Sequence, residues 1–323
     1  MNIKKIGLTA LAASLVSTSV FAGELTASGG ASLAVEGYSG TGLASDTAFS
    51  MGDSVILSGS TELDNGMTVT MSFELDGTSE STVSGLSAYD DNSLTIASDA
   101  LGTLVFAAHG GSSATSAIDA TAAGNIFDNF DGAANGLTVT GVADGSAAAG
   151  DNSLHYTLPA MVDGLALMAS LNTGGATGTN ATGWAGTYTG VEGLSVSYGV
   201  GNIETGLSTT AGDQTVMKAS YAFGPLTLGY SNNDINLGDD TTDKKTTSWG
   251  LSYTVSDDIS VTYGVETIDL ADATDAEYEG ITASYTTGGM TVSLTSQDAA
   301  NIDNTVDTDN DFDYWALGLS FAF

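Results

Sequence analysis

Carboxylates and aromatic rings occur together in a long polar stretch of the chain, residues 110–151. Three of its five acids lie in the first part of the stretch, with a phenylalanine on either side of the middle one: Asp119, Phe127, Asp128, Phe130 and Asp131. Carboxylates gathered around a narrow passage attract cations and hold back anions. A polar loop of roughly forty residues is uncommon unless it has a function, so we expect these acids to line a constriction, with the two rings anchoring the loop to a wall. The alternative is a solvated surface loop.

A second set of charged residues falls within segments in which bulky apolar residues alternate with small polar ones. The polar side of these segments carries four glutamates and one lysine: Glu36, Glu62, Glu74, Glu266 and Lys218. Alternate residues of a strand point to opposite faces, so each of the five lies on the polar face of its strand. We expect them to line a water-filled interior; the alternative is an exposed position at a rim.

The two histidines of the chain, His109 and His155, flank the long polar stretch. If they lie on neighbouring strands and point the same way, they form a pH-sensitive or metal-binding pair, because histidine titrates near neutral pH without any perturbation. No third ligand stands in a recognisable motif beside them. The alternative is polar lining at the root of the loop.

Alternating acids near the end of the chain, Asp307, Asp309 and Asp311, resemble the start of a calcium loop. An EF-hand loop needs glycine at its sixth position and glutamate at its twelfth. Counted from Asp307, these positions hold Phe312 and Gly318. We therefore expect no required cofactor, and only loose association of calcium or magnesium with acidic loops.

The composition excludes several classes of function. The chain has 39 acidic residues against 5 basic ones, all of them lysines, and it has no cysteine. Nucleic acid is excluded as a partner because almost nothing can neutralise phosphates. Disulfides, thiol chemistry and cysteine-based metal sites are impossible. With 42 glycines and abundant Ser and Thr, the chain favours strands over helices.

Residues 1–22 have the form of a secretory signal peptide. Lys4 and Lys5 precede an apolar run, and Val20-Phe21-Ala22 offers small residues at the cleavage positions. We expect a mature domain spanning residues 23–323. No other apolar run approaches the roughly twenty residues of a membrane-spanning helix, so a membrane location would require strands.

The last residues of the chain form the clearest strand. Its bulky residues alternate with small ones: Trp315, Leu317, Leu319, Phe321 and Phe323. A strand of about ten residues with a bulky outer face and a small, wet inner face is typical of a transmembrane barrel in contact with lipid. Similar segments recur along the chain, for example Val55–Glu62 and Met67–Leu75 around the turn Asp64-Asn65-Gly66.

Sixteen such segments can be counted, and they alternate between tight turns and long polar stretches such as 39–52 and 233–245. An even number places both chain ends on one side of the membrane, as bacterial single-chain barrels require. Buried unpaired carboxylates are costly, so the acidic inner face implies water, and a barrel of this size is wide enough to hold it. The prediction is an all-β, 16-stranded antiparallel transmembrane barrel with short periplasmic turns and long outer loops.

The pattern resembles the general bacterial porins, the sixteen-stranded diffusion channels of the Gram-negative outer membrane. The resemblance lies in the end of the chain from Tyr314 to Phe323, in Asp151-Asn152-Ser153-Leu154-His155-Tyr156-Thr157-Leu158-Pro159 followed by Gly164-Leu165-Ala166-Leu167, and in the insertion at 110–151. It implies a third loop folded into the lumen, a homotrimer, and contact with outer-membrane lipid and lipopolysaccharide. The family's usual arginine ladder is missing, and its common arginine in the Asn-Ser-x-x-Tyr segment is replaced by His155.

These observations favour passive diffusion of small hydrophilic solutes and ions, with a preference for cations. An enzyme is the second class considered, but neither histidine stands in a recognisable catalytic triad motif. The third class is a calcium-loaded surface or adhesin protein, which should show Gly/Asp nonapeptide repeats, and the chain has none. We therefore expect a channel and not an enzyme.

Overall fold

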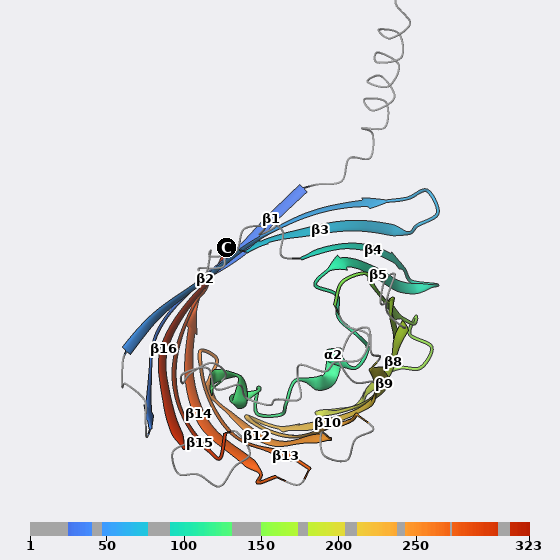
Figure 1. Ribbon diagram of the computed structural model, residues 1–323. Coiled ribbons are helices and arrows are strands. Elements are labelled where there is room, and N and C mark those ends of the chain that lie inside the picture. Colours follow the sequence, from blue (N-terminus) through green and yellow to red (C-terminus); the bar gives the residue numbers. More distant parts are fainter. Residues whose placement is uncertain are drawn as a thin grey trace, which may run out of the picture.

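The computed structural model describes residues 25–40, 47–76, 91–130, 150–173, 180–203, 212–237, 243–271, 273–302 and 311–323. Within these ranges sixteen strands form one closed antiparallel barrel in which each strand pairs with its neighbours in sequence (Figure 1). The first eight strands are β1 (Leu25–Gly40), β2 (Thr47–Glu62), β3 (Thr68–Asp76), β4 (Asn92–Ser98), β5 (Gly102–His109), β6 (Ser153–Thr157), β7 (Leu165–Thr173) and β8 (Asn180–Val191). The others are β9 (Leu194–Ile203), β10 (Gly212–Phe223), β11 (Leu226–Asn236), β12 (Lys244–Ser256), β13 (Ile259–Leu270), β14 (Ala276–Thr287), β15 (Met290–Ala300) and β16 (Phe312–Ala322).

The barrel closes where β16 pairs with β1, from Gly30↔Ala322 to Gly40↔Phe312. Phe323 extends this seam: its backbone N–H donates to the carbonyl of Gly29 at 3.0 Å, and its own carbonyl accepts from the Gly29 N–H at 2.9 Å. Closure leaves no unpaired edge between the two strands, which is the condition for a sheet in hydrocarbon. The predicted sixteen-stranded barrel is confirmed.

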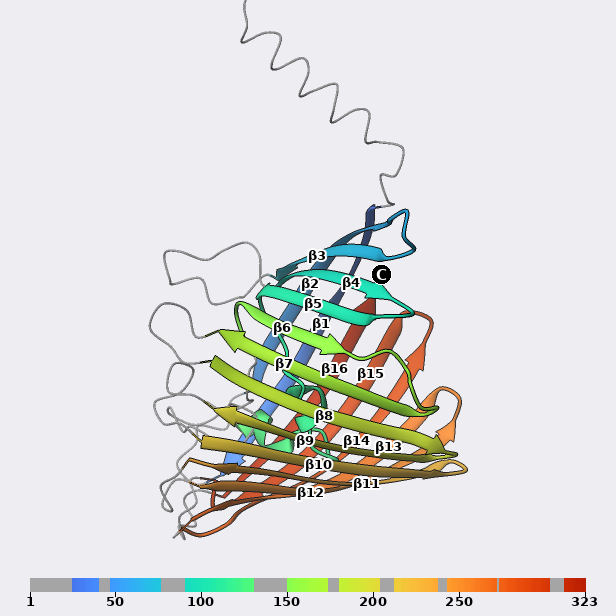
Figure 2. The same cartoon turned by 90° about the vertical axis from the view of Figure 1, so that its right-hand side faces the viewer.

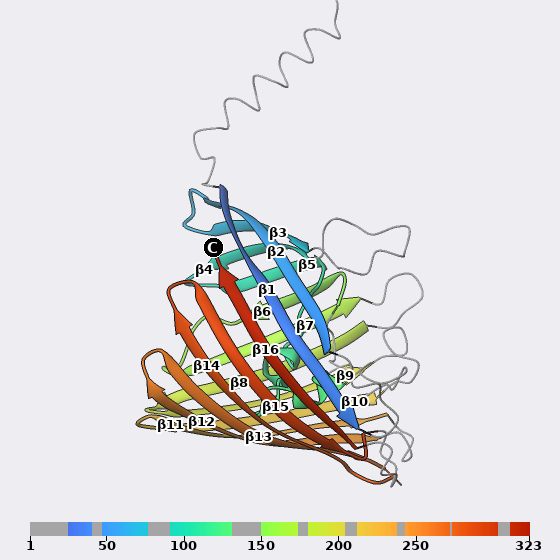
Figure 3. The same cartoon turned by 90° about the vertical axis from the view of Figure 1, so that its left-hand side faces the viewer.

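Short turns gather at one end of the barrel, beside the start of β1 and the C-terminus (Figures 2 and 3). The turn between β2 and β3 shows why the sequence folds there. Gly66 adopts a positive φ of 79°, which glycine accepts without strain, and the Asn65 side chain accepts from the Met67 N–H at 3.2 Å. Among the described residues, no helix has the length and apolar character needed to cross a membrane.

The strands keep the predicted alternation of side chains. Outward positions of β16 are apolar and exposed, as at Trp315 and Leu317, whereas the inward Tyr314 and Ala316 are buried. The neighbouring strands alternate in the same way. Leu317 lies opposite Val35 of β1 across the seam and opposite Leu294 of β15 on its other side. Bulky apolar side chains on the outside of a closed barrel are the arrangement that lipid stabilises.

Phe323→Ser should weaken the folded barrel because the phenyl ring is 72% exposed on the outer side of the seam. Transferring a ring of this size from water to hydrocarbon contributes about 1.5–3 kcal/mol, and serine loses that contribution while keeping both backbone hydrogen bonds to Gly29. We expect a lower midpoint of urea unfolding in lipid vesicles. Phe323→Leu, which keeps an apolar side chain, should recover most of the loss; equal midpoints for the serine variant and the wild type would contradict the assignment.

Strand limits differ from the predictions mainly at the loop end. β2 was expected to begin at Val55 after a loop over 39–52, but it begins at Thr47, and its first residues pair with β1. β12 begins at Lys244 inside the expected loop 233–245, and β11 continues to Asn236. The last strands show why the loop ends were mistaken: near the loop end their outward residues are charged, yet they still pair. Glu279, Asp298 and Asp313 are cross-strand partners on the outer face. Strand pairing continues past the apolar band, so the apolar alternation ends before the hydrogen-bonded ladder does.

Candidate functional site

The segment that follows β5 lies inside the barrel. It contains one turn of helix, α2 (Ser116–Asp119), and a 3-10 helix, η2 (Ile126–Phe130), and both lie within the ring of strands in Figure 1. The helix α2 contacts β9 and β10, whereas η2 contacts β13, β14 and β15. Residues 111–130 therefore form an inner belt along one arc of the wall. The prediction that the third long loop enters the lumen is correct for this part of it.

A compact turn shapes the middle of the inner belt. Thr121 and Asn125 bond reciprocally: the Thr121 N–H donates to Asn125 Oδ1 at 2.8 Å, and the Asn125 N–H donates to Thr121 Oγ1 at 2.6 Å. Asn125 has a φ of 55°, a conformation that asparagine tolerates better than most residues. The turn brings the backbone of Ala122 and Ala123 against the wall.

Wall serines accept hydrogen bonds from the belt backbone. The Ala114 N–H donates to Ser170 Oγ on β7 at 2.9 Å. Further along, the Ala122 N–H donates to Ser231 Oγ on β11 at 3.0 Å, and the Ala123 N–H donates to Ser248 Oγ on β12 at 2.9 Å. A buried peptide N–H without an acceptor is costly, so these inward serines hold the belt at defined strands.

Glu266 of β13 points inward as predicted, but it does not line water. Its side chain is 1% exposed beneath the belt. One carboxylate oxygen accepts the hydroxyl of Thr121, and the other accepts the backbone N–H of Phe127 at 3.2 Å. The expectation of a lumen-facing glutamate is corrected: strand parity gives the side of the sheet but not what covers it. Glu266 is an anchor for the belt.

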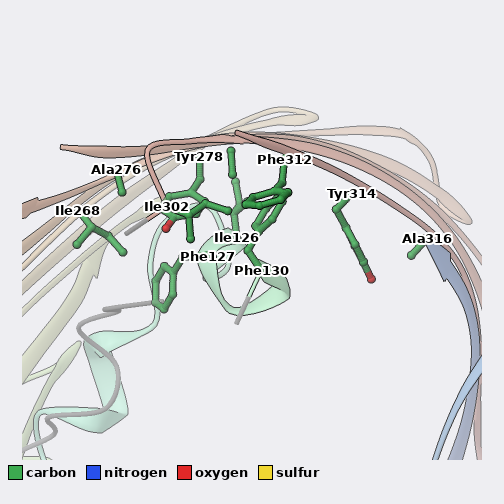
Figure 4. Packing of buried hydrophobic residues seen from close by; sticks show 11 residues of the cluster. Ile126, Phe127, Phe130, Ile268, Ala276, Tyr278, Ile302, Phe312, Tyr314 and Ala316 are labelled. Atoms are coloured by element: carbon green, nitrogen blue, oxygen red, sulfur yellow. The ribbon is translucent and has the colours of Figure 1, made fainter. Parts of the chain in front are cut away.

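Aromatic packing holds the far end of the belt. Phe127 and Phe130 are 2% and 1% exposed, and their rings lie against the wall side chains of β14 and β16 (Figure 4). The Phe130 ring centroid is 5.7 Å from that of Tyr278 and 6.2 Å from that of Tyr314, and Phe127 is 6.4 Å from Tyr278. Each buried ring contributes about 1.5–3 kcal/mol, so the two anchor η2 firmly. Their packing has the geometry expected of anchoring rings.

The wall contacts continue across the barrel seam. Asn129 donates its side-chain amide to Gln297 Oε1 on β15 at 2.9 Å, and its backbone carbonyl accepts the Tyr38 hydroxyl of β1 at 2.8 Å. Tyr38 packs on Tyr314 with ring centroids 5.0 Å apart, and the Tyr314 hydroxyl donates to Glu36 at 3.0 Å. The belt therefore reaches from β7 to β1. The wall serines, Gln297 and Tyr38 were not predicted as contacts of this segment. In the sequence they differ in no way from other polar residues on the inner face of a strand.

Lys218 lies inward on β10, as predicted, and its ammonium group donates to the backbone carbonyl of Ala120 at 2.8 Å. Lys218 and Lys244 are the two inward lysines of the described strands. The positive charge nearest the belt is thus engaged with a belt carbonyl.

The arc opposite β10 carries acids. Glu36 on β1, Glu62 on β2 and Glu74 on β3 point inward, in phase with the polar residues of their strands. Asp76, two residues beyond Glu74, shares this face and was missed because the strand was expected to end at Leu75. In the closed order of strands, β2 and β10 stand eight positions apart. The inner wall is acidic on one side and carries Lys218 on the other.

The two histidines do not form a pair. β5 and β6 are neighbours, but His155 lies opposite Val105, four residues before His109. Four residues of strand span about 13 Å. His109 instead lies between two carboxylates, with Nδ1 4.0 Å from Asp91 and Nε2 3.8 Å from Asp151. The two imidazole nitrogens face different acids, so this trio cannot chelate a single ion, and the proposed histidine pair is wrong.

The remaining candidate residues are only partly placed. Asp128 is exposed on η2, and Asp119 ends α2. Asp311 accepts the Asn301 N–H at 3.1 Å. Asp131, Asp307, Asp309 and the side chain of Asp119 lie outside the described residues. Within the described part of the chain, no three His, Asp or Glu side chains are arranged to hold a metal ion.

A closed barrel with an apolar exterior, a polar inner wall and a belt packed along one arc defines a membrane channel. A profile of the Gram-negative porin family matches residues 7–323, and the chain belongs to that family. Family and fold together identify an outer-membrane diffusion channel. A search among curated proteins found no match.

Solved structures show the same fold. A multiple mutant of the Rh. blastica porin superposes with a TM-score of 0.65 at 17% identity, over 93% of this chain and 100% of that one. The anion-selective porin from Comamonas acidovorans gives a TM-score of 0.66 at 16% identity, over 93% of this chain and 99% of that one. At such identities the likeness concerns the barrel, and each protein's own side chains decide which ions pass.

Proposed function

We propose that the barrel conducts small hydrophilic solutes and ions by passive diffusion and prefers cations. The observation that carries this proposal is the acidic arc of β1–β3, with Glu36, Glu62, Glu74 and Asp76 on the inner face. Acids on one wall of an aqueous bore raise the local cation concentration and lower that of anions. The opposing Lys218 is bonded to the belt and cannot balance four carboxylates.

The name of the Comamonas porin shows that this fold can also serve anions. Selectivity must then come from the charges of the inner wall. The present chain has 39 acids against 5 lysines, and the inward positions repeat this imbalance. We infer that anions are disfavoured here, in contrast to that neighbour.

Planar bilayers test the proposal directly. Under a salt gradient the purified protein should show stepwise openings, with a reversal potential of the sign given by cation flow. The triple variant Glu36→Gln/Glu62→Gln/Glu74→Gln should move the reversal potential toward zero, because it removes three inner charges and keeps the side-chain shapes. Glutamine at position 36 can still accept the Tyr314 hydroxyl.

A matched control removes the same charge from the outside of the barrel. Glu277→Gln/Glu279→Gln/Asp298→Asn changes three outward acids of β14 and β15, whose field is screened by salt within about 10 Å at 0.1 M. Its reversal potential should stay near that of the wild type. Absence of any conductance would refute the channel, whereas equal shifts for both triple variants would refute the role of the inner acids.

We further propose a homotrimer that buries the outer face of β1–β5. Among the described residues, the exposed outward tyrosines and tryptophans, which mark lipid interfaces, all come from β8–β16: Trp184, Tyr188, Tyr198, Tyr221, Trp249, Tyr253, Tyr263, Tyr285 and Trp315. The exposed apolar residues of β1–β5 are of other kinds: Leu25, Leu33, Phe49, Met51, Val55, Met71, Leu104 and Phe106. An outer face without these tyrosines and tryptophans suits contact with another copy of the chain better than contact with lipid.

Single cysteines can test this arrangement, since the chain has none of its own. Met51→Cys on β2 should be protected from a membrane-soluble maleimide in the assembled protein, because the residue would lie in the interface. Leu228→Cys on β11 is equally outward and should react. Equal labelling of the two positions would contradict the proposed face.

We also propose that residues 1–22 direct secretion and are removed, and that the mature barrel lies among outer-membrane lipid and lipopolysaccharide. It needs no cofactor, and calcium or magnesium associates only loosely with its acidic loops.

A further inference from the structure

Four successive glycines occupy one row of the inner wall; the first three face the inner belt, and the fourth, Gly280 of β14, faces the side chain of Gln297. Gly229 of β11, Gly250 of β12 and Gly264 of β13 are successive cross-strand partners. None of the three has a positive φ, so backbone conformation does not require glycine at these positions. A glycine in a strand interior destabilises it by roughly 0.5–1 kcal/mol relative to alanine, and such a residue often marks the close approach of another backbone.

The approaching backbone is that of the inner belt. A Cβ atom at position 229 would lie 3.2 Å from the Cβ of Ala122. At position 250 it would overlap the carbonyl oxygen of Ala122, and at position 264 it would overlap Ala123. The obstacle at position 250 is main chain, which cannot rotate away as a flexible side chain can. The belt therefore lies closer to the wall than any side chain at Gly250 would permit.

The neighbouring row of the wall supplies the hydrogen bonds. Ser231, Ser248 and Glu266 are also successive cross-strand partners, and each stands two residues from a glycine of the first row on the same strand and the same face. All three accept hydrogen bonds from residues 121–127 of the belt. One row thus leaves room for the belt, and the next row binds it.

We propose that the glycine row Gly229–Gly250–Gly264 is a seat that fixes how far the inner belt projects from the wall and so sets the open cross-section of the channel. This inference rests on the proposed channel function and adds which residues determine the open cross-section of the channel. The determinant lies in wall residues that touch no permeating solute. These glycines are positioning residues, acting through the belt.

Gly250→Val tests the seat. Close-packed contacts do not absorb three added carbons, so the belt should move into the bore and lower the single-channel conductance by about 1.5-fold or more. Gly250→Ala should have a smaller effect of the same sign. The control is Gly52→Val on the inner face of β2, where an added Cβ atom would meet only the Ser32 hydroxyl, at 3.0 Å. It adds the same bulk to the bore without moving the belt, and its conductance should stay near that of the wild type.

A disulfide provides a second, independent test. The Cβ separation between positions 122 and 229 is 3.2 Å, close to the about 3.5–4.5 Å found in disulfides. Oxidised Ala122→Cys/Gly229→Cys should therefore form its bond readily and conduct like the wild type, because the bond holds the belt where it already lies. An oxidised form whose conductance differs from that of the wild type would overturn the proposal.

The outcomes distinguish failure of the proposed channel function from failure of the proposed seat. A wild-type protein that gives no channels refutes the proposed function. A conducting wild type in which Gly250→Val and Gly52→Val behave alike refutes the seat alone. Heat-modifiable migration on a gel confirms for each variant that the barrel has folded, and the disulfide variant decides the matter if Gly250→Val does not fold.

Discussion

Glu266→Leu should release part of the inner belt and make the channel noisy. Leucine has a similar size but accepts no hydrogen bond, so the Thr121 hydroxyl and the Phe127 N–H would lose their acceptors in a buried place. Each unsatisfied buried group costs about 1–3 kcal/mol, which gives about 2–6 kcal/mol for the pair. The belt avoids this cost by leaving the wall.

The cost should appear as belt motion and not as loss of the barrel. The strands on both sides of Glu266 keep their backbone ladders to β12 and β14, which do not depend on its side chain. Single-channel recordings should show frequent brief closures and a broadened conductance. Migration of the folded protein on a gel should stay unchanged.

Two further variants make this prediction specific. Glu266→Gln keeps one acceptor oxygen and the shape of the side chain, so its recordings should be intermediate. Glu62→Leu removes an inward carboxylate from the opposite arc and should alter ion preference without adding noise. Recordings of Glu266→Leu as quiet as those of the wild type would show that the carboxylate does not hold the belt.

The barrel itself could be predicted because lipid and water impose a simple period on the strands. In β12, Trp249, Leu251 and Tyr253 alternate with Ser248, Gly250 and Ser252, and that alternation identifies both the strand and its faces. The loop ends of the strands escaped prediction for the same reason. Beyond the apolar band the outward residues are polar, so the sequence no longer distinguishes a strand from a loop.

The candidate site was predicted less completely, because it depends on which strand positions meet. The alternation along each strand placed Glu266 and Lys218 on the inner face. Only the strand register and the path of the belt show that Glu266 is buried and that Lys218 is bonded to Ala120. The histidine pair was predicted wrongly because the sequence does not give the register between β5 and β6, which sets His155 opposite Val105. The glycine row left a readable signal: glycines at matching inward positions of consecutive strands, where an isolated glycine suggests close backbone approach.

Leu294→Arg should strongly destabilise the folded barrel, because Leu294 faces outward near the middle of β15. Its neighbours across the strands are Leu317 of β16 and Ala283 of β14, both without charge, and its side chain is 60% exposed. An arginine at the middle of the lipid face of a barrel costs about 2–4 kcal/mol, and less toward the interfaces. Urea titrations of protein refolded into vesicles should report this loss as a lower midpoint with an unchanged slope.

The adjacent residue supplies the matched control for this prediction. Ser293 points inward on the same strand, opposite Gly318, so Ser293→Arg places the same side chain in the aqueous bore. Its unfolding midpoint should remain close to that of the wild type, while its conductance and cation preference should fall because a positive charge now faces the permeating ions. The two neighbouring arginines would thus damage different properties, one the folding of the barrel and the other its transport. If both substitutions lowered the unfolding midpoint equally, hydrocarbon could not lie on one face of β15 and water on the other.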